Sequence, residues 1–458
     1  MSPVPISIPA QTPASLGAEA GLAYAAARLP RYTSYPTALQ FGPLDAATFR
    51  AWLAAIRPGD ALSLYVHIPF CKALCWYCGC HTSVTRSSAR LARYGAALAR
   101  EAGLLADALP HAAPVTHLHF GGGSPDALGA GGLASLLAAL RGRFAMAPGA
   151  EIAAELDPRN LDQATVAALA RGGLTRASLG VQDVSPEVQA LIGRTQPTSL
   201  VESAVARLRA AGVGAINLDI MYGLPGQTVA HVEATARFVA AQGAARVAAF
   251  GYAHVPWMRP NQKAIDTSLL PDTAERLRQA EAIEAALRAA GYVAIGMDHF
   301  ARPEDPLARA AASGRLRRNF QGYTDDDAPV LLPLGASAIG RTAQGFAQNE
   351  PDERRWLAAI EAGRLATARG LALTADDRLR AAVIETVMCQ GEIATASVPS
   401  ALLVEAAPRL QRLIADGLVR AEEQRLVATD EGRRFIRHFA ACFDAYLAPG
   451  ANRHSAAA

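Results

Sequence analysis

The amino-acid sequence predicts an α/β fold: an incomplete (β/α)6 TIM-like barrel with an N-terminal arm and a mainly α-helical C-terminal domain. Two observations lead to this prediction. From residue 62 onward, short β-prone runs alternate with amphipathic helical stretches, which is typical of a parallel sheet covered by helices. After about residue 371 the alternation ends and helical stretches dominate. We therefore expect an arm at residues 1–50, a barrel domain at 51–370 and a helical domain at 371–458.

Six β-prone runs supply the strands of the predicted barrel: residues 62–67, 115–120, 151–156, 175–181, 214–221 and 247–253. Residues 90–109 are predicted to form a helix between the first two strands, because Leu91, Leu98 and Leu105 recur on one face. Six strand–helix units favour an incomplete barrel, and a closed eight-stranded barrel is the alternative. In both, a ligand binds at the carboxyl ends of the strands.

The two ends of the chain differ from the barrel. Residues 1 to about 21 are rich in Pro, Ser and Ala, so we expect a loose terminus until something docks it. Residues 31–36 predict an extended arm packed on the main domain. Helices are expected later at 271–290, 374–389, 400–416 and 431–447, with a short hairpin at 418–420 and 425–429. This order is similar to a winged helix, but its mixed charge favours a lid or substrate-site wall over a nucleic-acid surface.

Composition excludes several classes of protein. The chain has 458 residues, is 51% hydrophobic and carries a formal net charge of only +3, so it predicts a large core and no basic nucleic-acid face. No apolar run approaches the roughly 20 residues of a membrane span. No Lys or Arg precedes Arg28, so a secretory leader is not expected. Six cysteines in a chain of this length suit a reducing compartment. We expect a cytoplasmic protein that binds neither membrane nor nucleic acid.

Four cysteines lie within ten positions directly after the first predicted strand, at Cys71, Cys75, Cys78 and Cys80. The first three have the spacing C-x3-C-x2-C. Structural zinc would need a further pair of ligands, and disulfide frameworks suit small secreted domains. An electron-transfer cluster takes four cysteines, so three thiolates with one open iron is the remaining interpretation. Cys80 is a possible fourth ligand, but two positions after Cys78 is tight for two corners of one cube, so we place it beside the cluster.

Other candidate residues fall at the ends of the predicted strands. The turn at residues 121–125, Gly-Gly-Gly-Ser-Pro, exposes backbone N–H and C=O groups that could hold a carboxylate or an amino group, although many such turns bind nothing. Glu155 is an acid in an otherwise apolar strand. Gln182 follows the fourth strand and Arg194 lies past a short helix, where it could equally be a solvated arginine. Asp219 lies in an apolar strand, where a buried carboxylate needs a partner.

The cysteine spacing is the signature of radical S-adenosylmethionine enzymes, and the chain resembles one branch of them, the oxygen-independent coproporphyrinogen III oxidases (coproporphyrinogen dehydrogenases). The resemblance extends from about residue 30 nearly to the end of the chain. Two positions depart from the familiar pattern, since Tyr77 stands in place of Phe and Ser124 in place of Thr, and each keeps the ring or the hydroxyl. The matching segments are residues 30–37, 65–71, 79–80, 121–125, 155–158, 180–183, 219–225, 296–300 and 318–323.

The resemblance implies the chemistry. A [4Fe-4S] cluster on Cys71, Cys75 and Cys78 would leave one iron open to the amino and carboxylate groups of S-adenosylmethionine. Reductive cleavage would give a 5′-deoxyadenosyl radical that takes a hydrogen from the β-carbon of a propionate side chain of coproporphyrinogen III. Loss of CO2 would leave a vinyl group, and two rounds would give protoporphyrinogen IX without oxygen. The implied partners are this substrate and an electron donor such as flavodoxin or ferredoxin, with the enzyme a monomer.

The resemblance also assigns roles to residues, and implies two S-adenosylmethionine molecules per active site. The first would contact Tyr65, Gly122, Glu155 and Ile339. The second would contact Tyr77, Gly123, Ser124, Gln182, Arg194, Asp219 and Ala253. The catalytic group would comprise Tyr65, Glu155, Phe320 and Gln321.

The alternatives are a haem chaperone, a radical enzyme that modifies haem, and a cluster-bearing DNA or redox sensor. The Gly79-Cys80 pair and the arm at 31–36 argue against the chaperone, and the motifs at the barrel end argue against the sensor.

Overall fold

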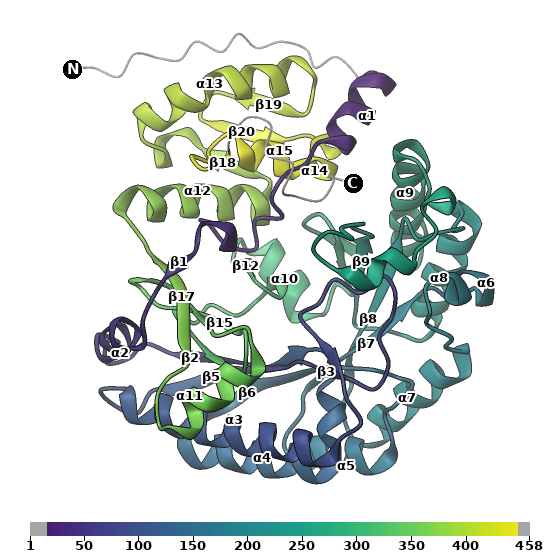
Figure 1. The fold of residues 1–458 in the computed structure, drawn as a ribbon. Coiled ribbons are helices and arrows are strands. Elements are labelled where there is room, and N and C mark those ends of the chain that lie inside the picture. Colours follow the sequence, from purple (N-terminus) through teal and green to yellow (C-terminus); the bar gives the residue numbers. More distant parts are fainter. Residues whose placement is uncertain (1–15, 448–458) are drawn as a thin grey trace.

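The computed structural model describes residues 16–447 (Figure 1). Most of the terminus that was predicted to be loose, residues 1–15, lies outside the described residues. Residues 18–21 belong to helix α1 (Ala18–Ala26), which is docked on the C-terminal elements. The helix is ordered by docking: the Tyr24 hydroxyl donates a hydrogen bond to Asp416, and Ala25 is fully buried in a cluster of C-terminal apolar side chains.

Within residues 16–447, thirteen strands form one sheet whose middle is parallel. The six predicted strands are confirmed. The structure adds a seventh parallel strand, β14, beside β2. All five of its residues are buried, so it lacks the alternation of apolar and polar residues that would have revealed it. The parallel strands, in spatial order, are β14 (Val330–Leu334), β2 (Leu62–Ile68), β5 (Pro114–Gly122), β6 (Ala145–Leu156), β7 (Arg176–Gln182), β8 (Ala215–Tyr222) and β9 (Arg246–Gly251).

Antiparallel strands extend the sheet at both edges instead of closing it. Next to β9 lie β11 (His299–Ala301) and then β10 (Val293–Ile295). Next to β14 lie β15 (Ile339–Arg341), β16 (Gly345–Asn349), β17 (Thr367–Ala372) and β1 (Gly42–Pro43). In the described part of the chain, the edge strands β1 and β10 do not pair with each other. The barrel is therefore incomplete, as predicted, and the closed eight-stranded alternative is wrong.

Helices cover the outside of the curved sheet (Figure 1). The predicted helices at 90–109 and 271–290 are confirmed as α3 and α9. Along β2, Leu64 and Val66 belong to the core beneath the helices, whereas Ser63 and Tyr65 line the barrel interior. Contacts link α11 with α3, α3 with α4, α4 with α5, α5 with α7, and α8 with α9. The helices of this outer layer are α2 (Ala46–Ala54), α3 (Ser88–Ala108), α4 (Gly129–Arg143), α5 (Gln163–Arg171), α6 (Pro186–Leu191), α7 (Thr198–Ala210), α8 (Val229–Ala241), α9 (Thr273–Ala289) and α11 (Glu353–Glu361).

The C-terminal elements lie above the barrel in Figure 1. The helices predicted at 374–389 and 400–416 are confirmed as α12 (Ala375–Gln390) and α13 (Ser400–Ala415). The predicted hairpin is β19 (Val419–Glu422) with β20 (Arg425–Ala428), and β18 (Glu392–Ala394) adds a third strand.

The helix predicted at 431–447 is wrong in extent. The chain turns at Phe435, which separates α14 (Asp430–Arg434) from α15 (Ile436–Ala441). The Phe435 ring centroid lies 5.9 Å from that of Tyr24, so the break lets this ring pack against α1.

The N-terminal arm packs mainly against these C-terminal elements. Leu29, Tyr32 and Tyr35 share their apolar cluster. The Tyr32 hydroxyl donates to Asp444 at 3.0 Å, and the Ala445 N–H donates to the Tyr35 hydroxyl at 2.9 Å. The two ends of the chain thus build one unit over the barrel. None of the helices within residues 16–447 has the length and apolar character needed to cross a membrane.

One buried carboxyl connects the barrel strands to the helices outside them. Glu101 of α3 accepts hydrogen bonds from Gly335 N at 2.6 Å, Asn349 Nδ2 at 2.8 Å and Trp356 Nε1 at 3.1 Å. Burial raises the pKa of Glu101 to about 7, although these three donors oppose that rise. The carboxyl fixes the turn that follows β14 against α3 and α11.

We expect Glu101 to make stability depend on pH. Because the folded-state pKa is raised to about 7 from 4.5, its contribution is fully present below pH 4.5 and is lost as the pH rises toward 7. Glu101→Gln should make the free energy of unfolding, measured by chemical denaturation, depend less on pH between 4.5 and 7. The substitution should also lower the free energy of unfolding by about 1–3 kcal/mol, because the NH2 group of the glutamine would face an N–H donor instead of accepting from it. The matched control is the exposed Glu202→Gln. An unchanged slope in the Glu101 variant would contradict the expectation.

Candidate functional site

A cavity of about 930 Å³ fills the barrel interior and reaches the carboxyl ends of the strands. The parallel register explains why residues distant in sequence meet there, because Glu155 pairs with Ser178 and Gly180 with Asp219 on adjacent strands. Ile339 of β15 is half-buried and is not in the cavity wall. The other predicted site residues line the cavity: Tyr65, Cys71, Cys75, Tyr77, Cys78, Gly122, Gly123, Ser124, Glu155, Gln182, Arg194, Asp219, Ala253, Phe320 and Gln321.

The cysteine loop leaves the barrel through a short strand pair, β3 (Phe70–Cys71) with β4 (Ser83–Val84). Cys71 begins the loop, and its Sγ lies 3.3 Å from the Thr82 hydroxyl. Trp76 N–H donates to Ile192 O at 3.0 Å, which fixes the middle of the loop to the end of α6. The loop therefore presents its cysteines to the cavity without regular secondary structure of its own.

Two consecutive amide side chains hold the loop from outside. They belong to a short 3-10 helix, η3 (Pro260–Ala264). Asn261 Nδ2 lies 3.0–3.3 Å from the carbonyl oxygens of Cys75, Trp76 and Cys78. Gln262 is buried, and its Nε2 donates to Tyr77 O at 2.8 Å. Every carbonyl from Cys75 to Cys78 thus has a side-chain donor.

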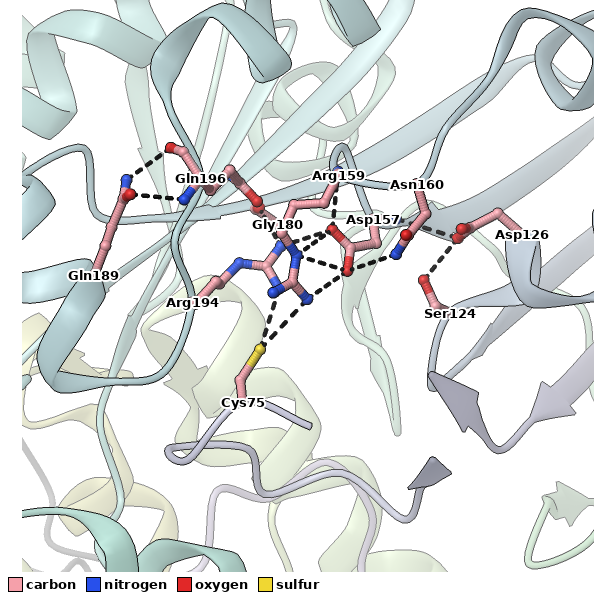
Figure 2. A network of polar contacts seen from close by, with 10 residues as sticks. All are labelled: Cys75, Ser124, Asp126, Asp157, Arg159, Asn160, Gly180, Gln189, Arg194 and Gln196. Atoms are coloured by element: carbon pink, nitrogen blue, oxygen red, sulfur yellow. Dashed lines mark hydrogen bonds and ion pairs between the residues drawn. The ribbon is translucent and has the colours of Figure 1, made fainter. Parts of the chain in front are cut away.

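A buried charge network surrounds Cys75 (Figure 2). Arg194 Nη1 lies 3.4 Å and Arg159 Nη2 3.6 Å from the Cys75 sulfur. Asp157 accepts from both arginines, with Arg159 Nη2 at 2.6 Å and Arg194 Nη2 at 3.3 Å. Arg194 Nη2 also donates to Gly180 O at 2.7 Å. The carboxylate therefore orients two guanidinium groups so that their N–H groups face one sulfur.

Cys80 lies beside Cys78, and its N–H is 3.4 Å from the Cys78 sulfur. Hydrogen bonding by Cys80, aided by the positive charges of Arg259 and Arg194, lowers the pKa of Cys78 to about 6. Burial raises the pKa of Cys71 to about 11. Positive charge placed among these sulfurs would favour the thiolate form of each.

The three cysteine thiols have the ligand chemistry that an iron–sulfur cluster needs. A cluster binds its cysteines on separate irons at the corners of a cube, so the sulfurs lie farther apart than around one tetrahedral ion. Cys71, Cys75 and Cys78 share one cavity, and N–H groups face two of the sulfurs. Such hydrogen bonds tune cluster potentials.

The glycine turn after β5 allows close packing at the cavity wall. At Gly122, with φ +109°, a Cβ would lie 2.5 Å from the His67 ring. At Gly123, a Cβ would lie 2.7 Å from Phe70 O. No other residue fits either position, so backbone lines this part of the wall. Ser124 donates its hydroxyl to Asp126 at 2.6 Å.

Glu155 stays ionised inside the cavity. Burial alone would raise its pKa, but the hydrogen bond and charge of His119, together with Gly122 N–H, hold the pKa below its usual value. His119 Nε2 lies 2.9 Å from Glu155 Oε1. The Tyr65 ring stacks on His119 with centroids 5.9 Å apart, and its hydroxyl lies 3.1 Å from His67 Nδ1. The wall built by β2, β5 and β6 therefore offers a carboxylate beside an aromatic ring.

Asp219 forms the opposite part of the wall. Its partners are Ser178 Oγ at 2.8 Å and Asn217 Nδ2 at 2.7 Å, which supplies the partner that a buried carboxylate needs. Burial, reinforced by the charge of Glu155, raises the pKa of Asp219 to about 6. Gln182 on β7 adopts φ 68°, a strained conformation for a residue other than glycine.

Phe320 and Gln321 form the turn between β12 (Arg317–Asn319) and β13 (Gly322–Thr324). The Phe320 ring meets Phe346 edge to face, with centroids 5.9 Å apart. Ala253 follows β9, and its carbonyl accepts from Gln262 at 3.2 Å. The hairpin and the cysteine loop thus contribute to the wall of the same cavity.

Comparison with known proteins identifies the family. A profile described as the Radical SAM superfamily matches residues 65–239, and the HemN C-terminal domain matches residues 373–435. An oxygen-independent coproporphyrinogen III oxidase of Bradyrhizobium diazoefficiens is 47% identical over 448 residues, covering 96% of this chain and 99% of that protein. One from Paracoccus denitrificans is 44% identical, covering 94% and 97%. The chain belongs to the oxygen-independent coproporphyrinogen III oxidase family.

A solved structure shares the fold of this oxidase family member. Coproporphyrinogen III oxidase (HemN) from Escherichia coli, described as a radical SAM enzyme, is 37% identical, with a TM-score of 0.87 over 91% of this chain and 98% of that one. The resemblance found in the sequence is confirmed. Membership of the radical SAM family implies a [4Fe-4S] cluster and S-adenosylmethionine.

Sequence reasoning missed several residues of this oxidase site. Asp157 directly follows the predicted strand 151–156 but was not predicted as a site residue, and Arg159 was not distinguishable because arginines are abundant throughout the chain. Asn261 and Gln262 lie in a polar stretch far from the cysteines in sequence. His119, two residues before the glycine turn, was the most accessible signal, since alternation places it on the same side of β5 as the cavity.

We expect Asn261→Ala to weaken the cysteine loop without unfolding the barrel. It removes the donor shared by three loop carbonyls, so the reconstituted cluster should be lost about tenfold faster in air, given about 0.5–1.5 kcal/mol per hydrogen bond. Iron content and the decay of the cluster absorbance measure this. The exposed Gln163→Ala is the matched control. Equal decay of the Asn261 variant and the control would show that this amide does not hold the loop.

Proposed function

We propose that this chain converts two propionate side chains of coproporphyrinogen III to vinyl groups by oxidative decarboxylation, giving protoporphyrinogen IX without oxygen. The observation that carries the proposal is the meeting of the cysteine loop, the ionised Glu155 and the Phe320–Gln321 turn in one cavity. Relatives that share nearly the whole chain bear the name of this activity.

We infer that Cys71, Cys75 and Cys78 hold the [4Fe-4S] cluster. With S-adenosylmethionine bound, the cluster supplies the electron that generates a 5′-deoxyadenosyl radical. The protein's part is to hold the thiolates, exclude water and place the propionate side chain. Arg194 and Arg159 stabilise negative charge at Cys75, and Asp157 keeps both of them in place.

Two S-adenosylmethionine molecules per active site remain our proposal. Two adjoining parts of the cavity wall support it. Tyr65, Gly122 and Glu155 lie on β2, β5 and β6, and would serve the first molecule. The second part holds residues on or after β7 to β9, together with the nearby turn and loop: Tyr77, Gly123, Ser124, Gln182, Arg194, Asp219 and Ala253. Ile339, which lies outside the wall, contributes to the first site only if β15 moves.

The proposed partners follow from the same chemistry. A donor such as flavodoxin or ferredoxin would supply single electrons, and the half-exposed Trp76 in the cysteine loop offers an apolar contact for it. We propose that the enzyme works as a monomer in the cytoplasm and binds neither nucleic acid nor membrane. Mixed charge on the C-terminal unit supports the absence of a nucleic-acid partner.

The direct test is anaerobic. The protein is reconstituted with iron and sulfide, reduced, and given S-adenosylmethionine and coproporphyrinogen III. Chromatography should show protoporphyrinogen IX and 5′-deoxyadenosine appearing together. Cleavage of S-adenosylmethionine without decarboxylation would reject this substrate. Tight haem binding without any cleavage would favour the haem-chaperone alternative.

Cys75→Ser should abolish cluster retention and activity, since it removes the buried ligand that both arginines face. Iron analysis and the turnover assay measure this. Cys442→Ser is the matched control, because Cys442 is also buried but lies in the C-terminal cluster. A Cys75 variant with full iron content and normal turnover would refute the cluster assignment.

Glu155→Ala should fold and keep its cluster but lose S-adenosylmethionine cleavage. Removing the carboxylate leaves His119 and Gly122 N–H without their acceptor and the wall without its charge. We expect the 5′-deoxyadenosine yield to fall at least about a hundredfold, as for loss of a positioned charged group. The exposed Glu202→Ala is the control. A yield equal to that of the control would exclude this role for Glu155.

A further inference from the structure

A second cavity, of about 270 Å³, adjoins the main one. The arm at residues 32–35, the β12–β13 hairpin, β15 and α12 contribute to its wall. We call it the arginine alcove, because Arg317, Arg318, Arg341 and Arg378 line it. Phe320 lines both cavities and so stands at their boundary.

The alcove carries more positive than negative charge. Its four guanidinium groups face two carboxylates, those of Asp326 and Glu385. Asp326 already has partners outside the alcove wall, since it accepts from Ser63 and lies 3.1 Å from His117 Nδ1. Glu385 lies 4.0 Å from Arg317. Arg318, Arg341 and Arg378 are therefore left without a carboxylate partner in the described part of the chain.

These three arginines are held in place by backbone carbonyls, which fix their position but do not neutralise their charge. Arg341 Nη2 donates to Ala328 O at 3.1 Å, and Arg378 donates to Ala343 O at 3.0 and 3.2 Å. Arg318 is buried and donates to Arg31 O through Nε and Nη2, while its Nη1 has no hydrogen-bond acceptor among residues 16–447. Of the three, only Arg318 is buried, and it also lies over the Tyr323 ring at 4.3 Å. Arg341 is half-buried and Arg378 is exposed, so their guanidinium groups are accessible to a carboxylate ligand.

We propose that the arginine alcove binds carboxylate side chains of the substrate that the reaction leaves intact. The inference rests on the proposed function, in which two of the four propionates of coproporphyrinogen III are not decarboxylated. Guanidinium groups bind carboxylates through paired N–H donors. At about 270 Å³ the alcove is smaller than the usual small-molecule site, so it admits side chains and not the ring. The ring would then lie against Phe320, facing the cysteine loop across the main cavity.

Porphyrin binding tests the alcove without turnover. The probes are coproporphyrin III, which has four propionates, and protoporphyrin IX, which keeps only the two that do not react. Their affinities for the cluster-containing protein are measured by fluorescence quenching. Arg341→Gln and Arg378→Gln should each weaken both porphyrins by about tenfold, the worth of one charge-assisted hydrogen bond. The exposed Arg354→Gln of α11 is the matched control, and thermal unfolding confirms that each variant folds.

The outcomes separate the alcove from the proposed function. If the double variant R341Q/R378Q binds both porphyrins with unchanged affinity, the proposal that the alcove binds carboxylates is wrong. Weaker binding of coproporphyrin III alone would also overturn it, because the arginines would then hold the reacting propionates. Turnover by the wild-type protein tests the proposed function separately. If coproporphyrinogen III is converted, the double variant should show a raised KM with a smaller effect on kcat. If it is not converted but both porphyrins depend on the arginines, only the proposed function fails.

Discussion

The register of the parallel strands decides where each functional group of the barrel lies. Glu155 stands level with Ser178, and Gly180 with Asp219, so the polar side chains of neighbouring strands meet at one height. Because side chains alternate along a strand, a slip of one residue would turn Glu155 toward the helices and Leu156 toward the cavity. The buried apolar residues prevent that slip. The core therefore positions the site as well as stabilising the fold.

The cysteine loop depends on a different kind of support. The cysteines must face the cavity from a loop that has no regular backbone hydrogen bonding. The backbone carbonyls of the loop therefore need donors from other parts of the chain. Asn261 and Gln262 supply them from outside, and Arg194 with Asp157 fixes the inner side around Cys75. The side-chain amides of Asn261 and Gln262 thus bind the loop backbone, and the charged Arg194 lies against the Cys75 sulfur. The loop can thus be rigid without being a helix or a strand.

What could be predicted from the sequence was what is local or periodic. The six strands are short β-prone runs that alternate with amphipathic helical stretches, and C-x3-C-x2-C is complete within eight residues. Strand β14 was missed because it is buried on both faces and contains Pro333, which argues against a strand. The break at Phe435 was missed because the ring that Phe435 packs against, that of Tyr24, comes from a distant part of the chain. Asn261 and the arginine alcove depend on tertiary contacts that no pattern in one segment records.

Charge is divided between the two cavities in a way that bears on substrate orientation. Deep in the barrel the arginines are neutralised, Arg176 by Glu151 at 3.0 Å and Arg246 by Asp305 at 2.7 Å. Glu155, nearer the cysteine loop, has His119 Nε2 at 2.9 Å and Gly122 N–H at 3.3 Å as its partners. In the alcove, by contrast, Arg318, Arg341 and Arg378 have no carboxylate within ion-pair distance among the described residues. A polycarboxylate entering the main cavity is therefore repelled near Glu155 and attracted beside Phe320, so electrostatics orients the macrocycle before any group contacts its reacting carbon.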